Sequence, residues 1–143
     1  MRTLSAPVMS DIHSDIEDLV EEFDLLDDWE QRYRYLIDLG KALPDFPDAS
    51  RIDANKIRGC VSQVWLTTRH EEGLYHFQAD SDAHIVRGLA ALLLRLYSGR
   101  TAEDIQSVDA RDVLSRIGLS EHLTPQRSNG LASMIAYIRS VTS

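Results

Sequence analysis

The sequence predicts one α+β domain in which a small antiparallel sheet packs against helices. Apolar residues recur at helical spacing in the first and last thirds of the chain, whereas residues 61–79 are rich in strand-forming types and partly alternate between apolar and polar. A chain of 143 residues, 43% of them hydrophobic, can bury a core without disulfides or a structural metal. Because no repeat or linker divides it, we expect one domain over residues 1–143, with residues 1–13 as a flexible N-terminal extension.

Two amphipathic helices are expected in the N-terminal part of the chain. Residues 14–26 carry apolar side chains at helical spacing, and Ser14 followed by Glu17 has the form of a capping box. A second helix is expected over residues 29–42, capped by one of the two aspartates that precede it. The two prolines that follow this helix predict an extended loop.

The centre of the chain has the composition of a β-hairpin. Residues 61–68 are rich in Val, Trp and Thr, and residues 74–79 alternate aromatic and polar side chains. The intervening residues 71–73, two glutamates and a glycine, suit a hairpin turn. Because two strands alone are marginally stable, we expect a third short strand near residues 56–58, which gives a sheet of about three strands.

Residues 83–97 are apolar almost all round, which predicts a helix buried on most sides at the centre of the core. Ser81 or Asp82 can cap its start, and Gly99 suits its C-terminal exit. The other expected helix boundaries are Thr101 and Asp109 as starts of two short helices, Gly118 as an end, and Thr124 with Pro125 as the start of the last helix.

Charge and hydropathy exclude several classes of partner. The net charge of −8 argues against nucleic acid, because phosphate neutralisation needs a basic surface. The longest apolar run is far too short to span a membrane, so no membrane partner is expected. The first ten residues lack the apolar core and cleavage pattern of a signal peptide, and we therefore expect a cytoplasmic protein.

Cys60 is the only cysteine in the chain. A single cysteine excludes an intramolecular disulfide, a cysteine-rich zinc site and an iron–sulfur cluster held by this chain alone. It leaves two possibilities, a small buried hydrophobic residue or a reactive thiol. Gly59 allows a tight turn just before the thiol, and the cations of Lys56 and Arg58 favour the thiolate, which is the form that attacks sulfur.

Arg127 is the other residue that local stability does not explain. It falls in the first turn of the last helix, where the positive end of the helix dipole disfavours a cation. Either it forms a structural ion pair or it faces a partner or a site. The five histidines show no spacing that selects a base for a cysteine hydrolase or a metal-binding pair, so we expect no metal.

Four segments together resemble the SufE family, which includes the closely related CsdE proteins. They occur in the order of the family, with the cysteine in its place, and the resemblance covers about residues 15–140. The segments are Trp29-Glu30-Gln31-Arg32-Tyr33 with Leu36-Ile37 and Gly40; Gly59-Cys60-Val61-Ser62-Gln63-Val64-Trp65; Asp80-Ser81-Asp82-Ala83 with Ile85-Val86 and Gly88-Leu89; and His122-Leu123-Thr124-Pro125-Gln126-Arg127 with Gly130.

The resemblance implies a fold like that of IscU-type scaffold proteins, and it implies an activity. In this family the cysteine of the Gly-Cys motif, here Cys60, accepts persulfide sulfur from a cysteine desulfurase of the SufS or CsdA kind and stimulates that enzyme. Gly59, Asp82 and Arg127 map as site or interface residues. The pyridoxal phosphate cofactor belongs to the desulfurase, so this chain needs no cofactor, and the sulfur passes to a downstream acceptor such as a cluster scaffold.

Two other functions are compatible with the sequence. The chain could be an interaction module that activates a desulfurase allosterically, with Cys60 incidental, or an iron–sulfur scaffold, which a single cysteine disfavours. If Cys60 carries sulfur, we expect it to be sheltered in the free protein, because a persulfide is labile to passing thiols. Ile57, Val61, Val64 and Trp65 supply the apolar surroundings for such a shelter.

Overall fold

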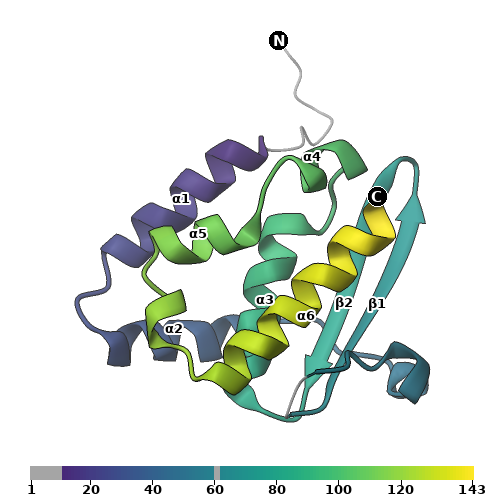
Figure 1. The fold of residues 1–143 in the computed structure, drawn as a ribbon, viewed down its shortest axis with the longest axis horizontal. Helices are drawn as coiled ribbons and strands as arrows, with labels where there is room; N and C mark the ends of the chain where they lie inside the picture. Colours follow the sequence, from purple (N-terminus) through teal and green to yellow (C-terminus); the bar gives the residue numbers. More distant parts are fainter. Residues whose placement is uncertain (1–10, 60–61) are drawn as a thin grey trace.

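The structure is a computed structural model and describes residues 11–59 and 62–143. It confirms the predicted α+β class (Figure 1). No helix in these two ranges is long and apolar enough to cross a membrane. The elements are α1 (Ile12–Asp24), α2 (Trp29–Lys41), the 3-10 turns η1 (Asp48–Ser50) and η2 (Asp53–Asn55), β1 (Val64–Glu71), β2 (Leu74–Ser81), α3 (His84–Tyr97), α4 (Ala102–Gln106), α5 (Ala110–Arg116), η3 (Ser120–His122) and α6 (Pro125–Thr142).

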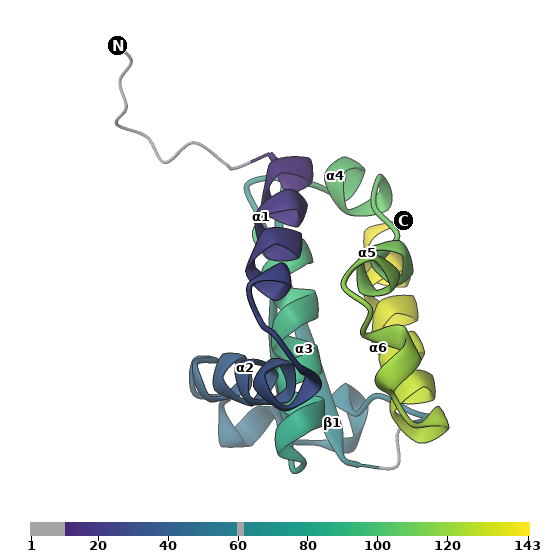
Figure 2. The ribbon, with the colours of Figure 1, turned by 90° about the vertical axis from the view of Figure 1, so that its left-hand side faces the viewer.

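Helix α3 is the centre of the core. It contacts α1, α2, α6 and β2, and Leu89, Leu92, Leu93 and Leu96 are each at most 1% exposed. Figure 2 shows α5 and α6 as a layer beside the one that α1, α2 and α3 form. An apolar residue on nearly every side of α3 is what burial between these layers and the hairpin requires, as the sequence predicted.

Helix α1 begins two residues earlier than predicted. Its N-cap is Asp11, and Ser14 lies inside the first turn, so the expected Ser14–Glu17 capping box is wrong. Ile12 is 1% exposed and lies one turn before Ile16, so burying it adds half a turn to the helix. Residues 12 and 13 therefore belong to the fold and not to the N-terminal extension; residues 1–10 lie outside the described part of the chain.

The hairpin pairs β1 with β2 over their full length, from Val64 opposite Ser81 to Glu71 opposite Leu74. Its two-residue turn has left-handed backbone at Glu72 (φ 53°) and Gly73 (φ 80°), as expected for a type I′ turn.

The predicted third strand is wrong: within the described residues the sheet has two strands. Lys56 makes an isolated bridge with Trp65, and the Ile57 amide donates to the Val64 carbonyl at 2.8 Å. Pairing stops there because Gly59 has a left-handed φ of +89° and turns the chain away from the sheet.

Local capping chemistry sets most helix starts as predicted. Asp28, Thr101, Asp109 and Thr124 each accept a hydrogen bond from a backbone amide in the first turn of the following helix. The start of α3 differs from the prediction, because its N-cap is Ala83 and has no side-chain cap. The Ser81 hydroxyl instead accepts from the Ala83 amide at 3.2 Å, and the Asp82 carboxylate binds Gln63.

Helices α2 and α3 cross in contact through two glycines. A Cβ on Gly88 would lie 2.2 Å from the Leu36 carbonyl oxygen, and a Cβ on Gly40 would lie 2.9 Å from the Gly88 nitrogen. Real Cβ atoms do not approach backbone atoms this closely, so this packing of the two helices requires glycine. The crossing fixes the first turns of α3, which carry one wall of the site described next.

Candidate functional site

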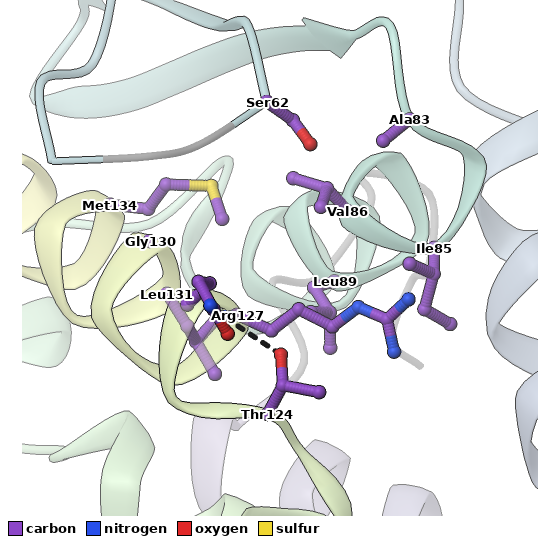
Figure 3. A pocket seen from close by; sticks show the side chains of 11 residues that line it. Ser62, Ala83, Ile85, Val86, Leu89, Thr124, Arg127, Gly130, Leu131 and Met134 are labelled. Atoms are coloured by element: carbon purple, nitrogen blue, oxygen red, sulfur yellow. Dashed lines mark hydrogen bonds between the residues drawn. The ribbon is translucent and has the colours of Figure 1, made fainter.

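A cavity of about 290 Å³ lies between the first turns of α3 and the first half of α6 (Figure 3). Val86 and Leu89 of α3 face Leu131 and Met134 of α6 across it. These apolar walls give the cavity a low polarity, which strengthens the effect of any charge placed at its edge.

Arg127 supplies a charge at that edge. Its amide donates to the Thr124 hydroxyl at 3.3 Å, which fixes its backbone in the first turn of α6. Its half-buried side chain reaches from α6 toward Ile85 and Leu89 of α3 (Figure 3). Among the described residues its guanidinium has no hydrogen-bond or ion-pair partner, so no structural ion pair found there explains Arg127.

Cys60 and Val61 lie outside the described residues, so the predicted shelter around the thiol stays a prediction; its other residues, Ile57, Val64 and Trp65, are described and do not line this cavity. The described residues on either side of Cys60 and Val61 lie at the cavity and against the helix that forms one of its walls. Ser62 lines the cavity, and Gly59 packs against α6, because a Cβ at Gly59 would lie 2.7 Å from the Ser133 hydroxyl oxygen. Gly59 thus combines a left-handed backbone with a close contact, and both favour glycine.

Asp82, predicted as a site or interface residue, does not line this cavity. Its carboxylate accepts hydrogen bonds from Gln63, from the backbone amide at 3.0 Å and from the side-chain amide at 3.4 Å. The neighbouring Ser81 hydroxyl donates to the Gln63 carbonyl at 2.7 Å. Asp82 therefore holds the chain three residues after Cys60 against the end of β2, and its neighbour Ala83 lines the cavity.

The predicted cations Lys56 and Arg58 precede Gly59. Lys56 is half-buried at its bridge with Trp65, and Arg58 is exposed. Neither has an ion-pair partner in the described part of the chain, so both charges are available to an anion nearby.

A set of aromatic and polar contacts that the sequence did not predict fixes the start of α6. The Trp29 ring stacks on His122 with centroids 3.8 Å apart, and the Tyr33 hydroxyl donates to the His122 carbonyl at 2.6 Å. The Arg32 guanidinium lies over Trp29 at 5.0 Å and donates to the Ile117 carbonyl at 3.4 Å. Trp29 is half-buried, and these contacts tie α2 to the segment that leads into Thr124.

The chemistry of the site is that of a guanidinium beside an apolar cavity. In the described ranges, no three side chains of His, Cys, Asp or Glu come together as a metal-binding group. The perturbed titrations lie elsewhere: hydrogen bonding to Arg95, in the last turn of α3, lowers the pKa of Glu22 despite partial burial. Burial, and then the hydrogen bond to Glu22, raise the pKa of Tyr35. With its guanidinium and apolar walls, the site is suited to hold an anionic or polarisable group.

Comparison with known proteins decides the family. The sequence model of the SufE family, described as an Fe-S metabolism associated domain, matches residues 17–142. The chain belongs to the SufE family. This confirms the resemblance of the four segments and links the protein to iron–sulfur metabolism, as the family description states.

Relatives agree with the family and the fold. The chain is 50% identical to an uncharacterized SufE-like protein of Rhizobium meliloti over 129 residues, which covers 87% of this chain and 92% of the relative. It is 51% identical to a similar protein of Rhizobium etli over 128 residues, with 87% and 86% covered. The solution structure of a hypothetical protein from Thermus thermophilus superposes with a TM-score of 0.74 at 21% identity, covering 90% of this chain and 93% of that one, which supports the fold alone.

Proposed function

We propose that this SufE protein is a cytoplasmic sulfur acceptor for a pyridoxal-phosphate-dependent cysteine desulfurase. Cys60 receives the persulfide sulfur and passes it to a downstream acceptor, such as the scaffold on which an iron–sulfur cluster is assembled. The observation that carries the proposal is the position of the chain on both sides of Cys60: Ser62 lines an apolar cavity, and Gly59 packs against α6 at Ser133, next to the lining residue Met134. Arg127, which has no partner among the described residues, lies at the edge of that cavity.

The transfer is a thiol exchange on a sulfur–sulfur bond. The Cys60 thiolate attacks the outer sulfur of the desulfurase persulfide, a new S–S bond forms on Cys60, and the S–S bond of the enzyme breaks. The electron pair of that bond stays on the enzyme's cysteine, which leaves as its thiolate. Any proton on the outer sulfur moves with that sulfur to Cys60. No external oxidant or reductant is needed, and the protein accelerates the desulfurase by freeing its cysteine for another turnover.

The cavity supports this function because a carrier has to protect its persulfide. In such a carrier, apolar walls would keep water and small thiols from a persulfide that enters the cavity, and a guanidinium at the edge would favour the anionic form of a thiol or persulfide. Arg58 and Lys56 act in the same direction from the preceding segment. A sulfur atom held in this way reacts slowly in the free protein and is released to a partner that reaches the cavity.

The test of the proposal is the mass of the intact protein. After incubation of the wild-type chain with a desulfurase and cysteine, we expect a mass increase of one sulfur atom that a thiol reductant removes. Peptide mapping should place the increase on the peptide that contains Cys60. A chain that stimulates the enzyme without gaining this mass would contradict sulfur acceptance.

Arg127→Ala should weaken sulfur acceptance without weakening the fold. Because the guanidinium has no partner among the described residues, its removal should leave the melting temperature within about 2 °C of wild type. Loss of its charge from the cavity should slow acceptance about tenfold, the usual scale for a charge-assisted contact. The measurements are a melting curve and the rate at which Cys60 gains sulfur.

The control for Arg127→Ala is Arg34→Ala, which removes an exposed arginine of α2 that pairs only with the exposed Glu30 among the described residues. It should change neither the melting temperature nor the acceptance rate. A large loss of stability in Arg127→Ala with normal acceptance would show that Arg127 serves the fold and not the site.

A further inference from the structure

Asp80 is the one carboxylate that is buried in the described part of the chain, at 6% exposure. It lies near the end of β2, opposite Trp65, on the face of the strand away from Ala79 and the core. Both Nε and Nη2 of Arg51 donate to its Oδ2, at 2.9 and 2.7 Å. Arg87 Nη1 lies 3.4 Å from its Oδ1.

The segment that buries Asp80 is the one that leads toward Cys60. Arg51 lies between η1 and η2, and its guanidinium lies 5.6 Å from the ring centroid of Phe46, which is itself only 5% exposed. The ion pair with Asp80 and the contact of η2 with β1 hold this segment against the hairpin at Arg51 and at residues 53–55. The same stretch of chain then pairs with β1 through the Ile57 amide before it turns at Gly59.

Asp80, Ser81 and Asp82 are consecutive, and they hold the chain on both sides of Cys60. Asp80 holds the incoming segment through Arg51. Ser81 and Asp82 hold the outgoing segment through the carbonyl and the amide of Gln63. The end of β2 therefore fixes two stretches of chain, residues 51–59 and 62–63, whose ends meet at the cavity.

We propose that Arg51 and Asp80 are positioning residues for sulfur acceptance: their ion pair, in which Asp80 is buried and the Arg51 side chain is 33% exposed, fixes the incoming segment so that Gly59 rests against Ser133 of α6, next to the cavity residue Met134. The consequence for sulfur transfer rests on the proposed function. The consequence for the segment itself rests only on the contacts, and it can be tested separately.

The contact with Arg51 dominates because the Asp80 carboxylate has few other partners. Its Oδ1 accepts no hydrogen bond from the described residues, and the Nε atom of Arg87 is likewise buried without an acceptor there. Without Arg51, Asp80 would keep one ion pair at 3.4 Å, and its Oδ2 would need water in place of the two lost donors, which favours movement of this segment away from the hairpin. Opening of this segment frees the bridge at Lys56 and Ile57 first.

Amide hydrogen exchange of the full-length protein tests the anchor. In Arg51→Ala we expect the Ile57 amide to exchange at least about tenfold faster than in wild type, because opening of the anchored segment exposes it. The Leu92 amide in the centre of α3 reports global unfolding, and the Gln63 amide reports the outgoing segment. Asp82→Ala should give the reverse pattern, with faster exchange at Gln63 and little change at Ile57.

Two further variants keep the test decisive. Arg95→Ala removes a half-buried ion pair with Glu22 in the last turn of α3, so it lowers stability without touching the anchor. It should raise exchange at Ile57 no more than at Leu92. If Arg51→Ala does not fold, Arg51→Lys keeps the charge but loses the paired donors, and it should still accelerate Ile57 by about threefold or more. If the folded Arg51 variant shows equal increases in amide exchange at Ile57 and Leu92, the anchor is overturned.

Sulfur acceptance then links the anchor to function. Arg51→Ala should accept sulfur about tenfold more slowly than wild type, with Arg51→Lys in between, while Arg95→Ala accepts at the wild-type rate. If wild type itself gains no sulfur, the proposed function fails, and the exchange data still decide whether the anchor exists. If wild type gains sulfur and Arg51→Ala gains it equally fast, the positioning role is overturned.

Discussion

Serine at position 60 should abolish sulfur acceptance entirely. A serine hydroxyl cannot form the sulfur–sulfur bond that carries the transferred atom, and the chain has no second cysteine to replace Cys60. The change from sulfur to oxygen is small, so Cys60→Ser should melt within a few degrees of wild type. The intact mass of the variant should stay unchanged after incubation with a desulfurase and cysteine.

The same variant separates the carrier from an allosteric module. A carrier that has lost its acceptor should still dock on the desulfurase, so Cys60→Ser should lose the stimulation and compete with the wild-type chain for the enzyme. A module that acts through its surface alone predicts full stimulation by Cys60→Ser. Sulfur acceptance undiminished in the variant would refute the assignment of Cys60. The control is Ser140→Ala, which keeps the thiol and changes an exposed position of α6 that does not line the cavity; it should accept sulfur.

Features set by local chemistry were predictable from the sequence. Thr124 caps α6 through a residue three positions away, and Asp28 does the same for α2, so the pattern needs no knowledge of the rest of the fold. Burial on all sides of α3 follows equally from its composition. The position of Arg127 in an unfavourable first turn correctly indicated a residue that local stability does not explain, since it has no partner among the described residues.

Features that depend on distant segments were not predictable. Asp80 follows Gln78 on the polar face of β2, and only the fold brings Arg51 to it. The third strand was expected because two strands rarely suffice, but α3 covers the core face of the hairpin and Arg51 binds Asp80 on the other. The sequence could mark Asp82 as a site residue, but only the structure shows that its carboxylate binds the Gln63 amide.

Gly88→Ala should be among the most destabilising conservative changes in this protein, although helix propensity predicts the opposite. In an isolated helix alanine is favoured over glycine by about 0.8–1 kcal/mol. Here the added Cβ would lie 2.2 Å from the Leu36 carbonyl oxygen and 2.7 Å from its carbon, both backbone atoms that cannot rotate away. Helices α2 and α3 would have to separate, and the packing of Leu36, which is 0% exposed, would be lost.

We expect Gly88→Ala to lose about 2–3 kcal/mol of unfolding free energy after the gain in propensity, the scale of an overpacked core. For a chain of this size that lowers the melting temperature by roughly 5–10 °C. Gly40→Ala, whose Cβ would meet the Gly88 nitrogen at 2.9 Å, should lose less. Asp38→Ala, at an exposed position of α2, controls for propensity and should stay near wild type or rise slightly. A melting temperature above wild type in Gly88→Ala would mean that the two helices can shift apart freely, and that their crossing does not hold the α3 wall of the cavity in place.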